Sequence, residues 1–183
     1  MGDLWDKVKN ATSVADLVIK LLQDDSKPAP STPTAPSKPR PSAPASNTTI
    51  SDLEYLYPPV KKAARLALDE CQRAGYAVKV VETLRTFTRQ ASLYEQGRSL
   101  AGGVVTQAKA GQSYHNYGLA LDISPTNEAI AAIFEKYGFE WGARWKSFKD
   151  YPHFQMTFGF SVSQLNGLYE QGGLSNVWKS IPA

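Results

Sequence analysis

Apolar residues recur along the first 25 residues at alternating steps of four and three, which is the spacing of one apolar stripe on a helix. The stripe consists of Leu4, Val8, Ala11, Ala15, Val18 and Leu22. We therefore predict an amphipathic helix over residues 1–25. Its apolar face is suited to docking on the rest of the chain or, equally, to self-association or docking on a partner. Binding to a membrane surface is less favoured, because aspartates outnumber lysines in this segment.

Residues 26–48 break this pattern. The segment holds seven of the twelve prolines of the chain and, beyond alanine, almost nothing apolar to bury. A segment of this composition does not fold alone, and its prolines favour an extended conformation. We predict a flexible linker over 26–48 and a globular domain over 49–183.

Helical and extended stretches alternate in the globular region. Prolines and glycines mark the ends of these stretches, and valine-rich or alternating segments indicate the strands. Residues 101–114, which are polar and rich in glycine, predict a long loop. The order of elements has no regular β-α-β repetition, so the fold class predicted is α+β. The predicted helices run from the prolines at 58–59 to Gly75, over 88–96 and over 127–137, and the predicted strands cover 76–82, 119–123 and 153–158.

Composition narrows the classes of protein to which the chain can belong. Its 183 residues are 42% hydrophobic and 20% charged, as in a globular protein. A net charge of +3 is too mild to indicate a nucleic-acid partner. The single cysteine, Cys71, excludes an internal disulfide and a thiolate metal cluster. No apolar run reaches the roughly 18 residues of a transmembrane helix. The N-terminus lacks the features of a secretion signal, so we expect synthesis in the cytoplasm without a signal peptide.

Candidate chemistry lies around the two histidines, each of which has a carboxylate nearby. His115 and Asp122 belong to the segment SYHNYGLALD, and the segment DYPH contains Asp150 and His153. Alternate residues of a strand share a face, so Asp122 points away from its apolar neighbours. Gly118 allows the backbone to turn, which brings His115 back toward Asp122. If the strands over 119–123 and 153–158 are neighbours, both histidines and Asp122 converge.

Two imidazoles and one carboxylate with an open fourth position are typical of a catalytic zinc site. We therefore predict one zinc ion per chain, bound by His115, Asp122 and His153. Asp150 is the candidate general base for a metal-bound water, the alternative being a solvated aspartate in a turn. Non-haem iron also uses two histidines and a carboxylate. Its first two ligands usually lie much closer in sequence, so zinc is favoured.

These segments resemble a known family. Residues 113–122 resemble the S-x-H-x-x-G-x-A-x-D motif of the VanY and L-alanyl-D-glutamate endopeptidase group of zinc peptidases, and residues 150–155 resemble its second motif. The resemblance implies a small antiparallel sheet with flanking helices, in a fold shared with the Hedgehog signalling domain. It also implies zinc at the three residues already named and a catalytic acidic residue at Asp150.

The family carries an arginine upstream of the first histidine, and the segment TLRTFTRQ resembles that region. It places Arg85 at the end of a strand, where a guanidinium can bind a substrate carboxylate or stabilise an oxyanion. The alternative is a surface arginine at the start of a helix. Ser113 is expected to form a hydrogen bond near the site, and Gln155 lies on the same face of its strand as His153. We predict Arg85, Ser113 and Gln155 as substrate-binding residues.

The second motif has the form Asp-x-Pro-His, whereas carboxypeptidases for D-alanyl-D-alanine typically have Glu-x-x-His. This form resembles phage endolysins, which cut peptidoglycan stem peptides between L-alanine and D-glutamate. The expected function is therefore an L-alanyl-D-glutamate endopeptidase that reaches the cell wall by holin-dependent release or by lysis. Two alternatives remain open: a D-alanyl-D-alanine carboxypeptidase and a catalytically silent, zinc-containing module that binds the wall.

Overall fold

The computed structural model of the chain describes residues 47–182. The helix predicted over 1–25 and the linker predicted over 26–48, apart from Asn47 and Thr48, lie outside the described residues.

Helices, short 3-10 turns and strands alternate along the described part of the chain. The helices are α3 (Pro58–Arg73), α4 (Phe87–Glu95), α5 (Glu128–Lys136) and α6 (Val162–Ser180), and the 3-10 turns are η1 (Leu53–Tyr55), η2 (Tyr114–Tyr117) and η3 (Gly142–Arg144). The strands are β1 (Lys79–Glu82), β2 (Ala120–Ser124), β3 (Glu140–Trp141) and β4 (His153–Gln155).

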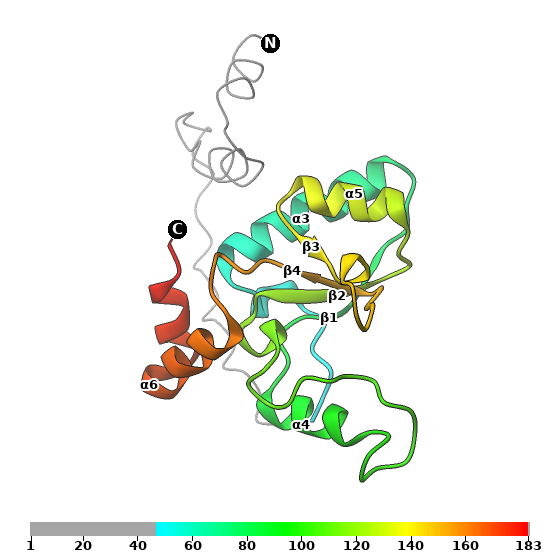
Figure 1. Ribbon diagram of the computed structural model, residues 1–183. Coiled ribbons are helices and arrows are strands. Elements are labelled where there is room, and N and C mark those ends of the chain that lie inside the picture. The colour runs from blue at the N-terminus through cyan, green and yellow to red at the C-terminus, as the bar shows by residue number, and fades with distance from the viewer. Residues whose placement is uncertain (1–46, 183) are drawn as a thin grey trace.

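The strands form one four-stranded antiparallel sheet in the order β1-β2-β4-β3. The two central strands are β2 and β4, whose sequences carry the two motifs (Figure 1). The predicted convergence of both histidines with Asp122 required these two strands to be neighbours, and they are paired. The predicted α+β class, a small antiparallel sheet with flanking helices, is confirmed.

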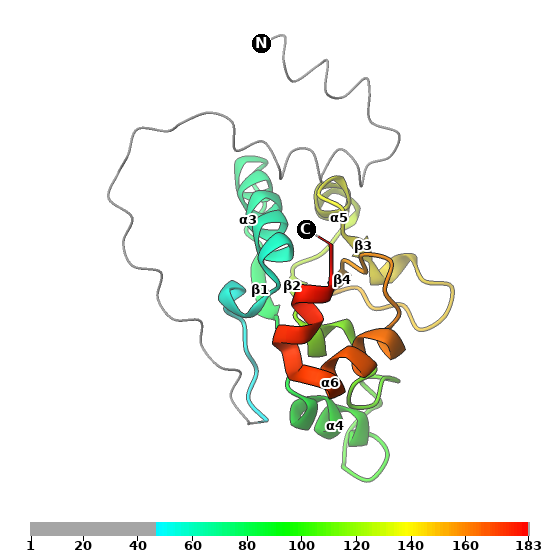
Figure 2. The same ribbon diagram turned by 90° about the vertical axis from the view of Figure 1, so that its left-hand side faces the viewer.

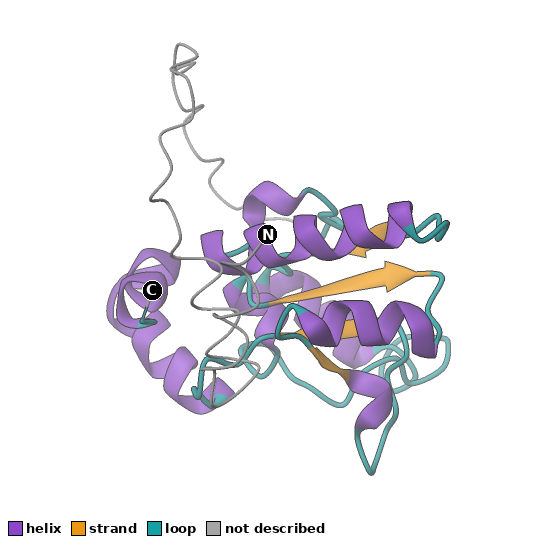
Figure 3. Ribbon diagram, turned by 90° about the horizontal axis from the view of Figure 1, so that it is seen from above, coloured by secondary structure: helices purple, strands orange, loops and turns teal. Residues whose placement is uncertain are grey.

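Helices α3 and α5 lie side by side over one face of the sheet (Figures 1 and 3). Each turns a stripe of buried residues toward the sheet, because these residues recur at helical spacing. The stripes consist of Val60, Ala63, Ala64, Ala67 and Cys71 on α3 and of Ile130, Ala131 and Phe134 on α5. Alternate strand residues, among them Leu121, Ile123 and Phe154, meet these stripes in the core. The opposite face of the sheet is thereby left for polar side chains.

The opposite face is approached by α4, by η2 and by the loop between them, which spans 97–112 (Figure 1). Helix α6, in front in Figure 2, packs against η2 from outside. Trp178 of α6 donates a hydrogen bond from its indole nitrogen to the carbonyl oxygen of Tyr117, at 2.7 Å. The sequence pattern did not predict α6, because Gly172 and Gly173 interrupt the helix and break its apolar stripe.

Two strands are shorter than predicted. Strand β1 begins only at Lys79, because the amide of Tyr76 donates to the carbonyl of Cys71 and closes α3 instead. Strand β4 ends at Gln155, and Phe158, predicted to lie within it, has a positive φ of 50° that is incompatible with a strand.

Candidate metal centre

A row of three polar side chains crosses the face of the sheet that is turned away from α3 and α5. The strand register pairs Asp122 of β2 with His153 of β4 on one side and with Glu82 of β1 on the other. Paired residues in an antiparallel sheet point to the same side. A bulge between Val80 and Glu82 produces this alignment, because a regular register would place Val81 opposite Asp122.

His115 reaches this row from η2, not from a strand. The side chain of Ser113 caps η2 by accepting a hydrogen bond from the amide of His115. Gly118 ends the turn with φ of 68°, which favours glycine, and leads directly into β2. A Cβ atom at Gly118 would lie 2.9 Å from the carbonyl oxygen of Tyr55, so the close packing also requires glycine. The predicted return of His115 toward Asp122 is present.

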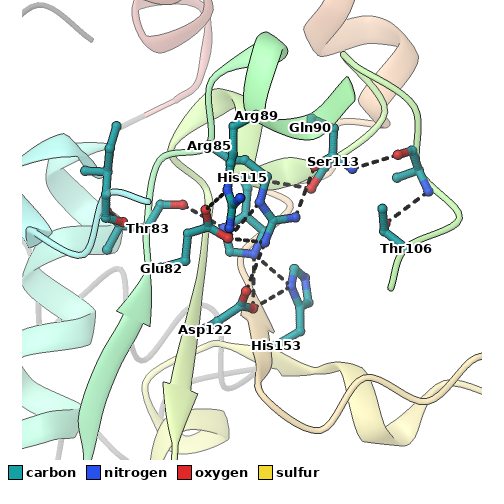
Figure 4. A network of polar contacts seen from close by, with 12 residues as sticks. Glu82, Thr83, Arg85, Arg89, Gln90, Thr106, Ser113, His115, Asp122 and His153 are labelled. Atoms are coloured by element: carbon teal, nitrogen blue, oxygen red, sulfur yellow. Dashed lines mark hydrogen bonds and ion pairs between the residues drawn. The ribbon is translucent and has the colours of Figure 1, made fainter. Parts of the chain in front are cut away.

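Three ligand atoms converge at this point (Figure 4). His115 Nε2 lies 3.1 Å from Asp122 Oδ1 and 3.1 Å from His153 Nδ1. The third side of the triangle, from His153 Nδ1 to Asp122 Oδ1, is 3.3 Å. The side chains of His115, His153 and Asp122 are 1%, 7% and 16% exposed, so the cluster is largely shielded from water.

Each imidazole has a hydrogen-bond partner on the side that faces away from the cluster, and this partner determines which ring nitrogen carries the hydrogen. His115 Nδ1 lies 2.6 Å from the carbonyl oxygen of Thr83, which can only accept, so Nδ1 donates. His153 Nε2 donates to Gln155 Oε1 at 3.0 Å, and the amide nitrogen of Gln155 donates in turn to Glu140. His115 Nε2 and His153 Nδ1 therefore direct lone pairs toward Asp122.

This donor set fits a tetrahedral metal ion. Nitrogen and oxygen ligands bind zinc at about 2.0–2.1 Å, which gives a separation of about 3.3 Å between neighbouring ligands of a tetrahedron. The observed separations of 3.1–3.3 Å lie close to that value. Three lone pairs at these distances repel one another unless a metal ion joins them or, without a metal, His153 takes up a proton, as its raised pKa favours. His115, Asp122 and His153 are therefore the residues that could hold a metal.

Electrostatics at the cluster also favour a cation. Burial lowers the pKa of His115, which keeps this imidazole neutral. Burial disfavours the charged forms of Asp122 and His153, but contacts outweigh it: those of Asp122 with His115 and then with His153, and that of His153 with Asp122. The pKa of Asp122 consequently falls well below its usual range, and that of His153 rises. An ionised carboxylate thus lies between two imidazoles in a site of low polarity.

Arg85 lies behind Asp122 and not on the surface, so the alternative of a surface arginine is wrong. Its Nη2 donates to Asp122 Oδ2 at 3.0 Å and to Glu82 Oε2 at 2.6 Å (Figure 4). Its Nε donates to the same oxygen of Glu82 at 2.9 Å. Glu82 also accepts a hydrogen bond from Arg89, so two guanidinium groups neutralise this buried carboxylate. The ion pair holds Oδ2 of Asp122 away from the cluster and leaves Oδ1 to face the two imidazoles.

The cluster lies in a cleft of about 350 Å³. Residues of the loop from Thr106 to Gln112 form one wall, and Trp145 and Phe148 also line the cleft, with the ring of Trp145 5.2 Å from that of His153. Asp150 lines the same cleft as the two histidines, and burial raises the pKa of its carboxyl group. It is not one of the converging ligands.

The three residues expected to bind substrate, Arg85, Ser113 and Gln155, all line this cleft. Sequence reasoning missed the carboxylate of Glu82 and the amide of Asn116 and gave Gln90, in the segment that resembles the family, no role; all three are buried beside Arg85. A polar residue closing a valine-rich strand was the only signal for Glu82. Nothing in the spacing distinguished the two amides.

Comparison with known proteins agrees with this site. A family model described as D-alanyl-D-alanine carboxypeptidase matches residues 106–156, which contain all three converging ligands. The peptidoglycan L-alanyl-D-glutamate endopeptidase CwlK of Bacillus subtilis is 37% identical over 122 residues, which are 55% of this chain and 73% of that protein.

The chain belongs to the VanY and L-alanyl-D-glutamate endopeptidase group of peptidases. The family resemblance of its two motifs is thereby confirmed. Another relative is the L-alanyl-D-glutamate peptidase of Listeria phage A118, which is 30% identical over 60% of this chain and 41% of that protein.

Two solved structures are similar in part to this member of the family. The L-Ala D-Glu endopeptidase ChiX of Serratia marcescens has 27% identity and a TM-score of 0.44, over 58% of this chain and 84% of that one. The LD-carboxypeptidase LdcB has 20% identity and a TM-score of 0.42, over 67% and 68% of the two chains.

Proposed function

We propose that this protein is a zinc peptidase that hydrolyses the stem peptides of peptidoglycan between L-alanine and D-glutamate. The observation that carries the proposal is the triangle of lone pairs from His115, Asp122 and His153, which has the dimensions of a tetrahedral zinc site. Membership of the peptidase family supports the reaction, and the names of the two relatives supply the substrate.

A bound zinc ion would supply Lewis acidity to a substrate carbonyl group and to a water molecule. Asp150 accepts the proton of the attacking water at its carboxylate and delivers it to the leaving amine. Its raised pKa suits the first of these tasks, because the carboxylate is then a stronger base toward the attacking water. Asp150 argues against a catalytically silent module, since a module that only binds needs no base.

Arg85 has two parts in this proposal. Its ion pair with Asp122 fixes the metal-facing carboxylate oxygen, which makes it a positioning residue. Because Arg85 also lines the cleft, its guanidinium remains available to a substrate carboxylate or an oxyanion. Ser113 and Gln155, which line the cleft beside the two histidines, complete the proposed substrate contacts.

A carboxypeptidase for D-alanyl-D-alanine is the second candidate, because the matching family model bears that description. The endopeptidase is favoured because the identity with CwlK extends over 122 residues and the model match covers only 106–156. Both reactions require the same metal, water and base.

Digestion of purified peptidoglycan distinguishes the two. We expect new N-terminal D-glutamate, with L-alanine left on the muramyl lactyl group, when the fragments are analysed by mass spectrometry. The Asp150→Asn protein, purified identically, controls for contaminating peptidases. Release of free D-alanine without a new glutamate amino group would favour the carboxypeptidase.

We further propose that the protein acts on the cell wall, since peptidoglycan is named for the relative CwlK. In residues 47–182, no helix is both long and apolar enough to cross a bilayer. Release through a holin or by lysis, and self-association or partner docking through residues 1–25, stay predictions.

A further inference from the structure

The amide of Gln90 lies between the metal cluster and the loop that forms one wall of the cleft. Gln90 is on α4 and is 0% exposed. Its Oε1 accepts a hydrogen bond from Arg85 Nη1 at 3.0 Å, and its Nε2 donates to the carbonyl oxygen of Ala108 at 2.6 Å (Figure 4). A buried amide that bridges two groups in this way has little freedom to adopt another orientation.

These bonds continue a chain that begins at the metal cluster. Asp122 Oδ2 accepts from Arg85 Nη2, and Arg85 Nη1 donates to Gln90, which holds Ala108. Ala108 lines the cleft together with the two histidines. The position of this cleft wall is therefore linked, through side chains that are all largely buried, to a carboxylate of the cluster.

A second amide holds the same loop but reaches only the backbone of Arg85. Asn116 donates from Nδ2 to the carbonyl oxygen of Arg85 at 2.9 Å and accepts from the amide of Gly111 at 3.0 Å. Segment 108–111 is thus held at both ends. Gln90 links the loop to the guanidinium group of Arg85, whereas Asn116 links the loop to the backbone of Arg85.

We propose that Gln90 is a positioning residue that couples the metal cluster to the substrate-binding wall of the cleft. The inference rests on the proposed function, which supplies the metal and the substrate. A metal ion that immobilises the carboxylate of Asp122 also immobilises Arg85 through their ion pair. The hydrogen bonds of Gln90 then restrict the motion of residues 106–112. Metal binding and substrate binding then strengthen each other, since such coupling is reciprocal.

Two substitutions of Gln90 separate the role of its amide oxygen from that of its amide nitrogen. In Gln90→Glu, an ionised carboxylate still accepts from Arg85 but has no hydrogen to donate to Ala108. In Gln90→Met, both bonds are lost with little change of volume. Asn116→Asp keeps the bond from Gly111 and loses the bond to the carbonyl of Arg85, so it loosens the loop by the other route. Gln72→Met, at an exposed position of α3, is the neutral control.

The first measurement is amide hydrogen exchange of residues 106–112, with zinc and after chelation. We expect zinc to slow exchange in the unaltered protein by about tenfold or more, the scale of one buried hydrogen bond. In Gln90→Glu and Gln90→Met, zinc should no longer change exchange in this loop. In Asn116→Asp, exchange should be faster but should still respond to zinc.

The second measurement is the kinetics of muropeptide hydrolysis, together with zinc affinity. For Gln90→Glu we expect KM to rise about tenfold with kcat nearly unchanged, and zinc affinity to be retained, because only the contact with the cleft wall is lost. For Gln90→Met we expect zinc affinity to fall as well, by about tenfold, since the support of Arg85 is removed.

Zinc-dependent protection of the loop in both Gln90 variants, or an unchanged KM with only a lower Tm, would overturn the coupling. Failure of both variants to fold would assign Gln90 to the core and would also overturn it. Hydrogen exchange requires no hydrolysis, so a wild-type protein that protects its loop with zinc but cuts no muropeptide refutes the proposed function alone. If the wild-type protein is active but zinc does not slow hydrogen exchange in its loop, the coupling alone is refuted.

Discussion

The two walls of the cleft are built on different principles. The wall that carries the metal cluster is made of paired strands, where the register of β2 and β4 places Asp122 opposite His153. The opposite wall, from Thr106 to Gln112, has no regular secondary structure and is held by side chains of other elements that bind its backbone. The candidate metal ligands are thus positioned by paired strands, whereas a loop lines the cleft on the other side.

This difference explains which side of the cleft tolerates change. On the strand wall, each functional group depends on a side chain whose identity matters. On the loop wall, the groups that Gln90, Asn116 and Tyr117 hold are the carbonyl of Ala108 and the amide and carbonyl of Gly111, which most residues could supply. Substitutions on the strand wall should therefore alter metal binding, and those that disturb the loop wall should alter substrate binding.

The largest effect is expected for His153→Ala. Removing one of three protein ligands should abolish zinc binding and reduce kcat by at least about a thousandfold, because both the Lewis acid and its water are lost. Zinc content by atomic absorption and activity on muropeptides are the measurements. Thr157→Ala, two residues beyond β4, is the control and should keep its zinc. Full zinc occupancy in His153→Ala would contradict the ligand assignment.

Asp150→Asn should come next, since it keeps the shape of the side chain but cannot accept a proton. We expect normal zinc content and a loss in kcat of about a hundredfold or more, the range of a general base. Loss of zinc in this variant would make Asp150 a ligand and change its assigned role. The effect sharpens the comparison, because Asp150 lies just before β4 and lines the cleft but is not one of the converging ligands.

The sequence predicted the strand wall well, because side chains alternate between the two faces of a strand and this alternation is visible in the sequence. Alternation along β2 separates Asp122 from the core residues Leu121 and Ile123, and Gly118 signals the turn that returns His115. Glu82 was missed because its place opposite Asp122 depends on a bulge, which leaves no pattern in the residues.

The loop wall could be predicted only as a loop. Its glycines and polar residues predicted a long loop and nothing about what holds it, yet Gln90, Asn116 and Tyr117 bind its backbone. Backbone acceptors have no sequence signature, because every residue has a carbonyl group. Helix α6, which adds Asn166 beside Gly111, was missed for the reason already given, its glycine break.

A smaller effect is expected for Gln155→Met, which removes the acceptor for His153 Nε2. Partners behind metal-bound histidines typically contribute about 10- to 100-fold in metal affinity, and we expect a loss in that range. Gln155→Glu keeps an acceptor for His153 and should retain more of the affinity, although it repels Glu140. Competition with a chromogenic chelator measures both. Equal losses in the two variants would mean that orientation of His153 is not the cause.

The smallest effect is expected at the loop wall, for Gly111→Ala. Gly111 has φ of 79°, and a Cβ atom there would lie 2.6 Å from Asn166 Oδ1 and 3.2 Å from a ring carbon of Phe87. Gly159, with φ of 78° and nothing within 4 Å of its Cβ position, is a matched control.

Both alanine variants should lose about 1 kcal/mol of stability from the left-handed backbone, measured by urea unfolding. Only Gly111→Ala should also raise KM, by roughly three- to tenfold, because the added methyl group displaces a loop that is held by single hydrogen bonds. Zinc affinity should be unchanged in Gly159→Ala and should fall slightly in Gly111→Ala, because the loop is linked to Asp122 through Gln90 and Arg85 and such coupling is reciprocal. A raised KM with unchanged zinc affinity in Gly111→Ala would show instead that the loop wall does not act back on Asp122.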